Sequence, residues 1–417
     1  MEQTSMLELG KRAKAAAMQI AGLDTAQKNA VLAAIADQLQ ADCAVILEQN
    51  KRDIACAREN GISEVMVDRL MLTEARVEAI AQATRKVMEL DDPVGMIDGG
   101  AKRPNGLAIT KMRVPIGVVG IIFESRPNVT VDAAVLCIKS GNVAFLRGGK
   151  EAICTNKALA DSMRKAIASV GLPEDMVLLV EDTTRDSATQ MMKLNGYLDV
   201  LIPRGSAGLI QAVVQNATVP VIETGAGNCH VYVDEGADLD MAVRIVDNAK
   251  TSRPSVCNAC ESLLVHEAVA AEFLPRVYDQ LQEHHVKMHG CARTQAILGD
   301  RVIPATEEDY AKEYLDYEIS VKVVDDVQEA IAHINRYSTK HSETIVTRDL
   351  KRARAFTTCV DSAAVYVNAS TRFTDGGEFG LGAEIGISTQ KLHARGPMGL
   401  KELTTIKYVI EGDGQIR

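Results

Sequence analysis

The stretch VPIGVVGIIFESRPNVTVDAA, residues 114–134, contains the first strand and the first helix of the pattern that decides the fold. Ile116–Phe123 is almost wholly apolar, as is typical of a strand buried on both faces, and a helix pattern runs from Asn128 to Lys139. Further apolar runs follow at 143–146, 177–180, 197–202 and 219–222, with helix patterns at 151–170 and 209–214. Strands that alternate with helices predict an α/β, doubly wound domain, in which helices cover both faces of a mostly parallel sheet.

The segments on either side of the alternating region have different patterns. Apolar residues recur at helical spacing in 6–20, 26–40 and 73–90, with Asp24 and Thr73 as expected N-caps and Gly61 as a helix end. Residues 95–114 contain Pro104-Asn105-Gly106 between two β-prone runs, which predicts a β-hairpin. The chain ends in one more β-prone run, 403–410, after a basic turn at 390–399.

A second α/β unit is expected to begin near Gly225, with β-prone runs at 321–324, 345–347 and 365–367. Within it, a helix pattern at 237–250 and an apolar run at 262–265 flank the loop TSRPSVCNAC, residues 251–260. Cys257 lies in this loop four residues after Arg253, and a nearby positive charge favours the reactive thiolate. Cys260 precedes Glu261, whose negative charge would raise the pKa of a thiol. Cys257 is therefore the candidate nucleophile, and a buried cysteine that packs as a small hydrophobe is the alternative.

Length and composition exclude several classes of protein. A chain of 417 residues with 47% hydrophobic and 24% charged residues is expected to form two or three globular domains. Its net charge of −10, without a lysine-arginine block, argues against a nucleic-acid binder. The first residues are polar and mixed in charge, unlike a secretory signal. Nine irregularly spaced cysteines then indicate reduced thiols, so a cytoplasmic protein is expected.

Two glycine-containing turns are candidates for binding a nucleotide. Arg147-Gly148-Gly149-Lys150 follows the second strand, where an arginine accommodates the 2′-phosphate of NADP and an acidic residue would bind the ribose of NAD. Gly205, Ser206 and Gly208 open the helix after the fourth strand, which suits a phosphate or nicotinamide contact. Ordinary surface turns with solvated charges are the alternative for both segments.

Two further groups of residues could carry chemistry. Asn128, at the carboxyl end of the first strand, could supply an amide donor to an oxyanion, together with the N–H of Cys257. A helix cap is the alternative for Asn128. His285 and His289 have the i, i+4 spacing of helical metal ligands and lie near His284 and Cys291. No glutamate accompanies them as in H-E-x-x-H, so a solvated helix end is expected there and no metal site.

The order of these features resembles the aldehyde dehydrogenase superfamily: Asn128 after the first strand, a basic residue after the next, a Gly-Ser turn, Glu223-x-Gly and then Cys257. The similarity runs over essentially all 417 residues, and it is most specific in 114–134, 136–152, 201–210, 252–258 and 365–399. It implies an NADP-binding domain made of 1–95, 115–224 and 366–387, a catalytic domain of 225–365, and an oligomerisation element of 96–114 and 388–417. The final strand is expected to pair across a subunit boundary, because a lone edge strand needs covering.

Within that superfamily the chain looks like the enzymes that use NADPH to reduce L-glutamyl 5-phosphate to L-glutamate 5-semialdehyde in proline biosynthesis. The resemblance implies that Cys257 forms a thioester as phosphate leaves, that Asn128 binds the oxyanion, and that Glu223 has no essential role. Glu378, in the glycine-rich segment 375–386, is the remaining cofactor contact that it implies. Arg126, Arg253 and Arg372 are the candidates for binding the anionic groups of the substrate.

The resemblance also implies a homo-oligomer, a dimer or a tetramer, and a glutamate kinase as a candidate partner that supplies the acyl phosphate. Two other functions stay open from the residues. One is an NAD(P)-dependent oxidation of a different small aldehyde by the same cysteine. The other is a zinc-dependent dehydrogenase or metal-binding module centred on His285 and His289.

Overall fold

The computed structural model describes residues 5–124 and 126–417 and divides the chain into two compact units. The first unit comprises Met1–Glu223, Gly380–Gly386 and Met398–Arg417, and the second comprises Thr224–Phe379 and Ile387–Pro397. The chain therefore returns to the first unit only at 380–386 and 398–417, whereas 366–379 lies with the second unit.

The first unit is built on a four-stranded parallel sheet in the order β5-β4-β3-β6. Its strands are β3 (Val118–Phe123), β4 (Val143–Arg147), β5 (Val177–Leu179) and β6 (Val200–Arg204), and the helices that connect or follow them are α6 (Asn128–Lys139), α7 (Ile153–Ser169), α8 (Arg185–Met192) and α9 (Ala207–Asn216). The strand order reverses direction at β3, so right-handed crossovers place α6 and α7 on one face and α8 on the other. The predicted doubly wound arrangement is confirmed.

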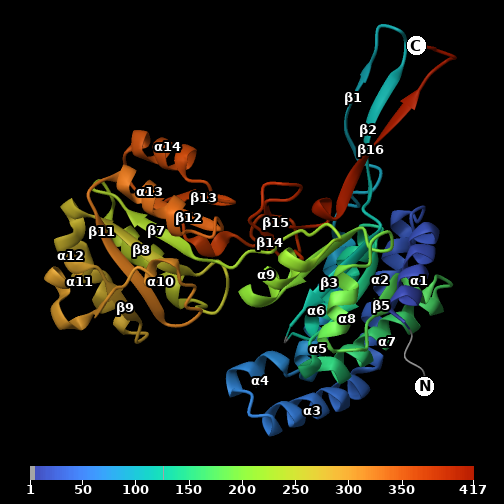
Figure 1. The fold of residues 1–417 in the computed structure, drawn as a ribbon, viewed down its shortest axis with the longest axis horizontal. Helices are drawn as coiled ribbons and strands as arrows, with labels where there is room; N and C mark the ends of the chain where they lie inside the picture. The colour runs from blue at the N-terminus through green and yellow to red at the C-terminus, as the bar shows by residue number, and fades with distance from the viewer. Residues whose placement is uncertain (1–4, 125) are drawn as a thin grey trace. The chain divides into compact units, whose positions relative to one another are not determined.

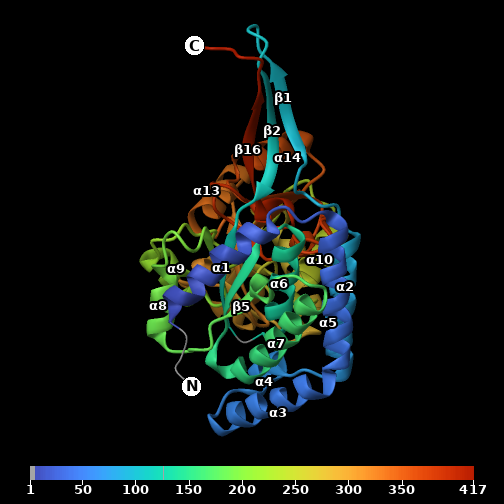
Figure 2. The same cartoon turned by 90° about the vertical axis from the view of Figure 1, so that its right-hand side faces the viewer.

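Helices at the N-terminus complete this unit (Figures 1 and 2). They are α1 (Met6–Ile20), α2 (Thr25–Ala41), α3 (Cys43–Glu59), α4 (Glu64–Leu70) and α5 (Glu74–Glu89). Asp24 and Gln27 form a capping box at α2, Thr73 caps α5 and Gly61 has a positive φ of 70°, so the predicted helix boundaries are confirmed. Among the described residues no single helix is long and apolar enough to cross a membrane, although α2 and α3 together, bent by 67°, pass that test.

A three-stranded antiparallel sheet extends from the first unit and carries the C-terminus near its tip (Figure 1). The predicted hairpin forms its β1 (Ile97–Lys102) and β2 (Ala108–Pro115), and Gly106 turns with a φ of 93°. β16 (Thr404–Glu411) pairs with β2 over its whole length, from Thr404 opposite Pro115 to Glu411 opposite Ala108. β2 of the same chain therefore covers one edge of the final strand, and the expected pairing of this strand across a subunit boundary stays a prediction for its other edge.

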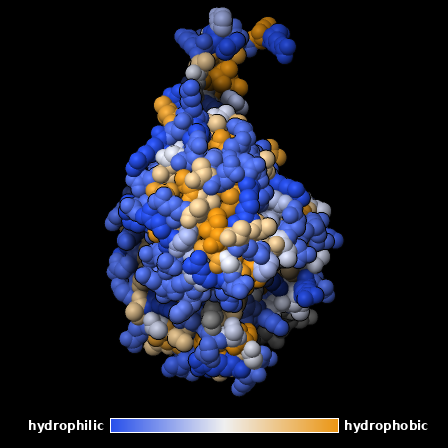
Figure 3. Space-filling view, turned by 90° about the vertical axis from the view of Figure 1, so that its left-hand side faces the viewer, coloured by the Kyte–Doolittle hydropathy of each residue, from blue (hydrophilic) through white to orange (hydrophobic). Residues whose placement is uncertain are grey.

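One face of β16 exposes apolar side chains at alternate positions. Tyr408 and Ile410 are 60% and 59% exposed, and Figure 3 shows hydrophobic atoms on this arm. One prediction for the first unit fails. The fifth strand expected at 219–222 is reduced to an isolated bridge between Leu201 and Val221, because Pro220 has no N–H to extend a ladder.

The second unit contains a seven-stranded parallel sheet in the order β10-β9-β11-β8-β7-β12-β13. Its strands are β7 (Cys229–Val233), β8 (Cys260–His266), β9 (Lys287–Gly290), β10 (Ile303–Pro304), β11 (Glu318–Val324), β12 (Ser342–Val346) and β13 (Ala364–Val367). Its helices are α10 (Leu239–Thr251), α11 (Glu267–Gln282), α12 (Ala292–Leu298), α13 (Val327–Tyr337) and α14 (Leu350–Cys359). A two-stranded ladder, β14 (Ile387–Ser388) with β15 (Gly396–Pro397), completes it.

Both faces of this second sheet are covered by helices. Val231 and Val233 of β7 pack into one buried cluster with α10, α11 and α12, whereas Tyr232 between them packs into another with α13 and α14. Side chains alternate between the two faces of a strand, so apolar residues at successive positions are what a sheet buried on both sides requires.

Candidate active site

Cys257 lies in the second unit, in the loop between the end of α10 at Thr251 and the start of β8 at Cys260, as predicted. The cysteines of this region differ in exposure, because Cys257 is partly exposed whereas Cys229 and Cys260 are fully buried. Burial raises the pKa of Cys260 to about 12, and Glu261 adds to that shift. The predicted direction for Cys260 is confirmed, although burial has a larger effect than its acidic neighbour.

The backbone of Cys257 is held closely by the segment that leads into β7. A Cβ atom on Gly227 would lie 1.4 Å from the carbonyl oxygen of Cys257, so only glycine leaves room for this approach. The Gly227 N–H donates to Glu313 Oε1 at 2.6 Å, and the Cys229 thiol donates to the Cys257 carbonyl at 3.2 Å. Burial raises the pKa of Cys229 well above its ordinary value, so this thiol acts as a donor and not as a thiolate.

Arg372 is bound to the same loop by several hydrogen bonds. Its guanidinium donates to Ser252 Oγ at 3.2 Å and to Asn258 Oδ1, and Asn258 Nδ2 donates back to the Arg372 carbonyl at 3.2 Å. Burial and then the charge of Arg253 lower the pKa of Arg372, while Cys257 opposes them. The structure thus brings together three residues predicted for the site, Cys257, Arg253 and Arg372. Asn258 was missed, although it directly follows the cysteine.

A buried ion pair joins the two ends of the Cys257 loop. Lys250, in the last turn of α10, donates to Glu261 Oε2 at 2.7 Å, and both side chains are fully buried. The Leu315 N–H donates to the other carboxylate oxygen at 3.3 Å. Because the two residues flank residues 251–260, the pair fixes the distance between the helix end and the strand start.

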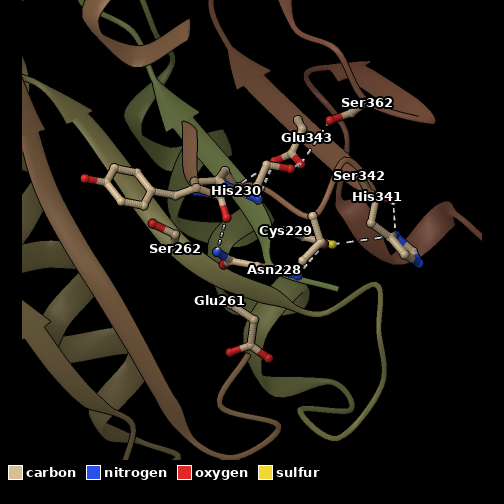
Figure 4. A network of polar contacts seen from close by, with 12 residues as sticks. Asn228, Cys229, His230, Glu261, Ser262, His341, Ser342, Glu343 and Ser362 are labelled. Carbon is tan, nitrogen blue, oxygen red and sulfur yellow. Dashed lines mark hydrogen bonds and ion pairs between the residues drawn. The ribbon is translucent and has the colours of Figure 1, made fainter. Parts of the chain in front are cut away.

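Figure 4 shows a second polar network, which joins β7 to β12, and the Glu261 side chain points away from it. Its centre is Glu343, which accepts from the His230 N–H at 2.7 Å and lies 3.1 Å from His230 Nδ1. His341 Nδ1 lies 3.7 Å from the Cys229 sulfur and 2.8 Å from Ser342 Oγ. These groups are buried and join β7 to β12, so the network stabilises the strands that support the loop.

In the first unit, Asn128 is the first residue of α6, whose N-cap is Pro127. The helix-cap alternative for Asn128 is therefore wrong. Its Nδ2 donates instead to Asp132 Oδ2 at 2.7 Å, one turn along the helix. Burial raises the pKa of Asp132 to about 6, opposed by the Asn128 hydrogen bond and by Arg204. Arg126 is partly buried in the segment before this helix.

The turn after β4 has the features of a site for an anionic ligand. Arg147 Nη2 donates to the carbonyls of Thr183 and Thr184 at 2.8 and 2.9 Å, but its Nε and the Nδ2 of Asn156 are buried without a partner among the described residues. A Cβ on Gly148 would lie 2.2 Å from Asn156 Nδ2. Buried donors without acceptors are rare, and here two of them lie beside the turn made by Gly148 and Gly149. These residues therefore fit a phosphate-bearing cofactor. Lys150 follows and is exposed.

The Gly205–Gly208 turn is occupied more fully than predicted. Ser206 is the N-cap of α9 and its side chain accepts from the Leu209 N–H, while its own N–H donates to Glu124 Oε2 at 2.8 Å. A Cβ on Gly205 would lie 2.5 Å from the same carboxylate oxygen, whereas Gly208 faces open space. The carboxylate thus already provides the negative charge favoured at a helix start.

Two other predicted groups lie elsewhere. Glu378 is exposed in the second unit, where its N–H donates to Asp375 Oδ1 at 3.4 Å. His285 and His289 do not share a helix, because α11 ends at Gln282 and His289 lies on β9. His289 contacts Glu318 at 3.2 Å and Asp309 at 3.5 Å, so its two ring nitrogens face carboxylates. The i, i+4 spacing therefore does not have the helical geometry that the metal alternative assumes.

Comparison with known proteins gives one consistent result. Residues 2–300 match the aldehyde dehydrogenase family. The chain is 59% identical, over 98% of both chains, to a γ-glutamyl phosphate reductase of Clostridium perfringens, and 59% identical, over 99% of both, to one of Carboxydothermus hydrogenoformans. A crystal structure of a γ-glutamyl phosphate reductase from Thermotoga maritima superposes with a TM-score of 0.97 at 50% identity, over 99% of this chain and 100% of that one.

Proposed function

The chain belongs to the aldehyde dehydrogenase family and within it to the γ-glutamyl phosphate reductases, and from this premise we propose how its residues perform the reaction. The reaction reduces L-glutamyl 5-phosphate to L-glutamate 5-semialdehyde, with release of phosphate, in proline biosynthesis. The observation that carries the assignment of Cys257 is the contrast between this partly exposed thiol beside two arginines and the buried thiols of Cys229 and Cys260.

In the proposed first step, the thiolate of Cys257 attacks the acyl carbon of the substrate. A C–S bond forms and the bond from that carbon to the phosphate oxygen breaks, so that phosphate leaves and a thioester remains. Arg253 and Arg372 favour this step in two ways, because their charges stabilise the thiolate and attract an anionic substrate. Gly227 and Cys229 hold the backbone of Cys257 from behind, which fixes the direction of attack.

The thioester is then reduced, and the resulting hemithioacetal releases the semialdehyde and regenerates the thiolate. Both tetrahedral species carry an oxyanion, and we assign its stabilisation to the Cys257 N–H and the side-chain amide of Asn128. An amide nitrogen has two N–H donors, and Asp132 accepts only one of them. Removing one such donor typically raises the barrier by about 3 kcal/mol.

The cofactor proposed for this chain is NADPH. When bound, it supplies the hydride for the reduction. Members of the aldehyde dehydrogenase family use nicotinamide cofactors, and an engineered glycolyl-CoA reductase of the same fold, 16% identical with a TM-score of 0.70, was solved with NADP+. Arg147, with its unpartnered buried Nε, and Lys150 are proposed to bind the 2′-phosphate, with Gly148 and Gly149 in the turn between them. Gly205, Ser206, Gly208 and Glu378 stay secondary candidates for this site.

We propose further that the enzyme is a cytoplasmic homo-oligomer. The exposed apolar side chains of β16 and the free edges of the three-stranded arm support assembly, and the nine free cysteines suit a reducing compartment. A glutamate kinase that hands over the acyl phosphate stays a candidate partner, because an acyl phosphate is exposed to hydrolysis in water.

One assay tests the proposed function directly. Purified protein is mixed with glutamate 5-semialdehyde, phosphate and NADP, and the rise in NADPH is followed with and without phosphate. The expected result is a phosphate-dependent rate that Cys257→Ser abolishes and the matched variant Cys260→Ser retains. Aldehyde oxidation that needs no phosphate would instead indicate an aldehyde dehydrogenase of a different substrate. Mass mapping after brief iodoacetamide treatment should find the label on Cys257, and fast labelling of Cys260 would contradict the mechanism.

A further inference from the structure

Asp132 lies one helical turn after Asn128 on α6, and its carboxylate accepts a hydrogen bond from the Asn128 amide at 2.7 Å. We propose that Asp132 binds the α-ammonium group of the substrate and thereby makes the enzyme selective for an amino acid over a plain aldehyde. This inference rests on the proposed function, because it takes glutamate 5-semialdehyde as the aldehyde and Asn128 as the oxyanion donor. It adds a group that recognises the substrate's only positive charge.

The electrostatic surroundings of Asp132 indicate that its partner is a ligand. Within residues 5–124 and 126–417, Asp132 makes no ion pair, and the one charged side chain that shifts its pKa is Arg204, which lowers it. Its side chain is only partly buried, yet burial is the main reason why its pKa rises to about 6. A desolvated carboxylate without a cation costs free energy, and such groups concentrate at binding and catalytic sites. An ammonium group in contact with Asp132 would remove that cost.

The distances agree with this role. Five bonds separate the carbonyl oxygen of glutamate 5-semialdehyde from its α-nitrogen, and when extended they span about 6 Å. An oxyanion bound to Asn128 and an ammonium bound to Asp132 would each lie about 2.8 Å from their partner. With the 2.7 Å between Asn128 and Asp132, that path reaches at most about 8 Å. One substrate can therefore contact both side chains at once.

The alternative is that Asp132 only positions Asn128. An ionised carboxylate can accept hydrogen bonds but cannot donate them, so it would make the nitrogen of the Asn128 amide, and not the oxygen, face it. Asp132→Asn separates the two roles. Its carbonyl oxygen can still accept from Asn128, whereas its charge is lost. A positioning role is largely kept in this variant, and recognition of an ammonium is not.

The experiment compares two aldehydes, glutamate 5-semialdehyde and 5-oxopentanoate, which is the same molecule without the amino group. For each, kcat/KM is measured in the phosphate-dependent direction with wild-type protein, Asp132→Asn, and the control Asp161→Asn on α7, outside the assigned site. The amine of the semialdehyde can add to its own aldehyde, but the free fraction cancels when the ratio of the two substrates is compared between proteins. Asp132→Ser serves as a second variant if Asp132→Asn does not fold.

The expected result is that Asp132→Asn lowers the preference for the amino substrate roughly 10- to 100-fold, mainly through KM, as expected for the loss of one charge-assisted contact. Its activity on 5-oxopentanoate and both activities of Asp161→Asn should stay near wild type. Equal losses on both aldehydes would overturn the inference in favour of positioning, and an unchanged preference would overturn it outright. Wild-type protein that oxidises neither aldehyde would instead refute the proposed function.

Discussion

Replacing Lys250 by methionine should destabilise the protein strongly. The side chain is fully buried and pairs with the equally buried Glu261 at 2.7 Å. Without Lys250, the Glu261 carboxylate keeps the Leu315 N–H at 3.3 Å as its remaining hydrogen bond among the described residues. Breaking a buried pair by removing one partner costs about 3–5 kcal/mol, because an uncompensated charge is left in the interior.

The double variant Lys250→Met/Glu261→Gln should recover most of that loss. Glutamine keeps an acceptor for the Leu315 N–H and carries no charge, so the lone buried ion is removed, and the neutral amide donors that replace it cost less than a buried charge. Replacing a whole buried ion pair by neutral residues is often close to neutral for stability. The double-mutant cycle should therefore give a coupling free energy of about 3 kcal/mol between the two positions.

The pH dependence of stability gives a second measure of the interaction between Lys250 and Glu261. Burial raises the pKa of Glu261 even with Lys250 present, so without Lys250 the folded protein should bind the proton still more tightly than the unfolded chain. A carboxyl whose folded pKa is raised contributes stability below its unfolded pKa, and that stability is lost as the pH rises. Because the pKa of Glu261 in the wild type is itself raised to about 7, both proteins lose stability in parallel below that pH, and the cost of Lys250→Met should grow only above it, at up to about 1.4 kcal/mol per pH unit.

The assay is urea unfolding of the four proteins of the cycle at pH 5.5 and pH 8, with iodoacetamide labelling of Cys257 as a local probe. Labelling should slow in Lys250→Met. Without the pair, the two ends of the loop are no longer held together, so the Cys257 thiolate is kept less firmly beside Arg372. Two results would refute the reasoning about an uncompensated buried carboxylate. One is a loss of unfolding free energy in the double variant that equals the sum of the losses in the two single variants. The other is a loss in Lys250→Met that shrinks as the pH rises.

Three further outcomes are expected. Arg147→Ala should reduce the preference for NADPH over NADH by about one to two decades, from the loss of a charged contact of roughly 1.5–3 kcal/mol. The variant Lys150→Ala, at an exposed neighbouring position, serves for comparison. An unchanged preference in Arg147→Ala would exclude Arg147 as the discriminating residue. Burial lowers the pKa of His341 to about 4, so stability should fall as the pH drops from about 6.5 towards 4, and His341→Asn should flatten that slope in denaturation curves. A chain truncated after Lys401 loses β16 and uncovers an edge of β2, so sedimentation should show lost assembly, whereas a monomeric full-length protein at micromolar concentration would contradict the oligomer.

Much of the fold could be predicted because its signals are local. Helix caps at Asp24 and Thr73 and the turn at Gly106 depend on side chains and dihedral angles a few residues apart. Apolar runs that alternate with helix patterns are enough to predict two parallel sheets, since each strand must be buried on both faces. The loop position of Cys257 follows from its flanking elements in the same way.

The sequence could not predict contacts whose partner lies far away in the chain, and predictions failed where a local pattern misled. Thr404 pairs with Pro115, almost 290 residues earlier, and no local pattern indicates which edge a β-prone tail will join. At 219–222 the apolar run resembles a strand, but Pro220 limits it to a single bridge. The spacing of His285 and His289 resembles a helix pattern, yet the helix ends before both of them.

By itself, then, the sequence determined the two α/β units, the family and the candidate nucleophile, because periodicity and motif residues are properties of contiguous segments. Tertiary structure alone decided what surrounds the reacting groups. It placed Gly227 against the backbone of Cys257, Arg372 beside Asn258, and Asp132 against Asn128. It also buried Cys260 and Glu261 while leaving Cys257 partly exposed. Burial and contacts between distant segments set pKa values and donor geometry, and they exist only once the chain is packed.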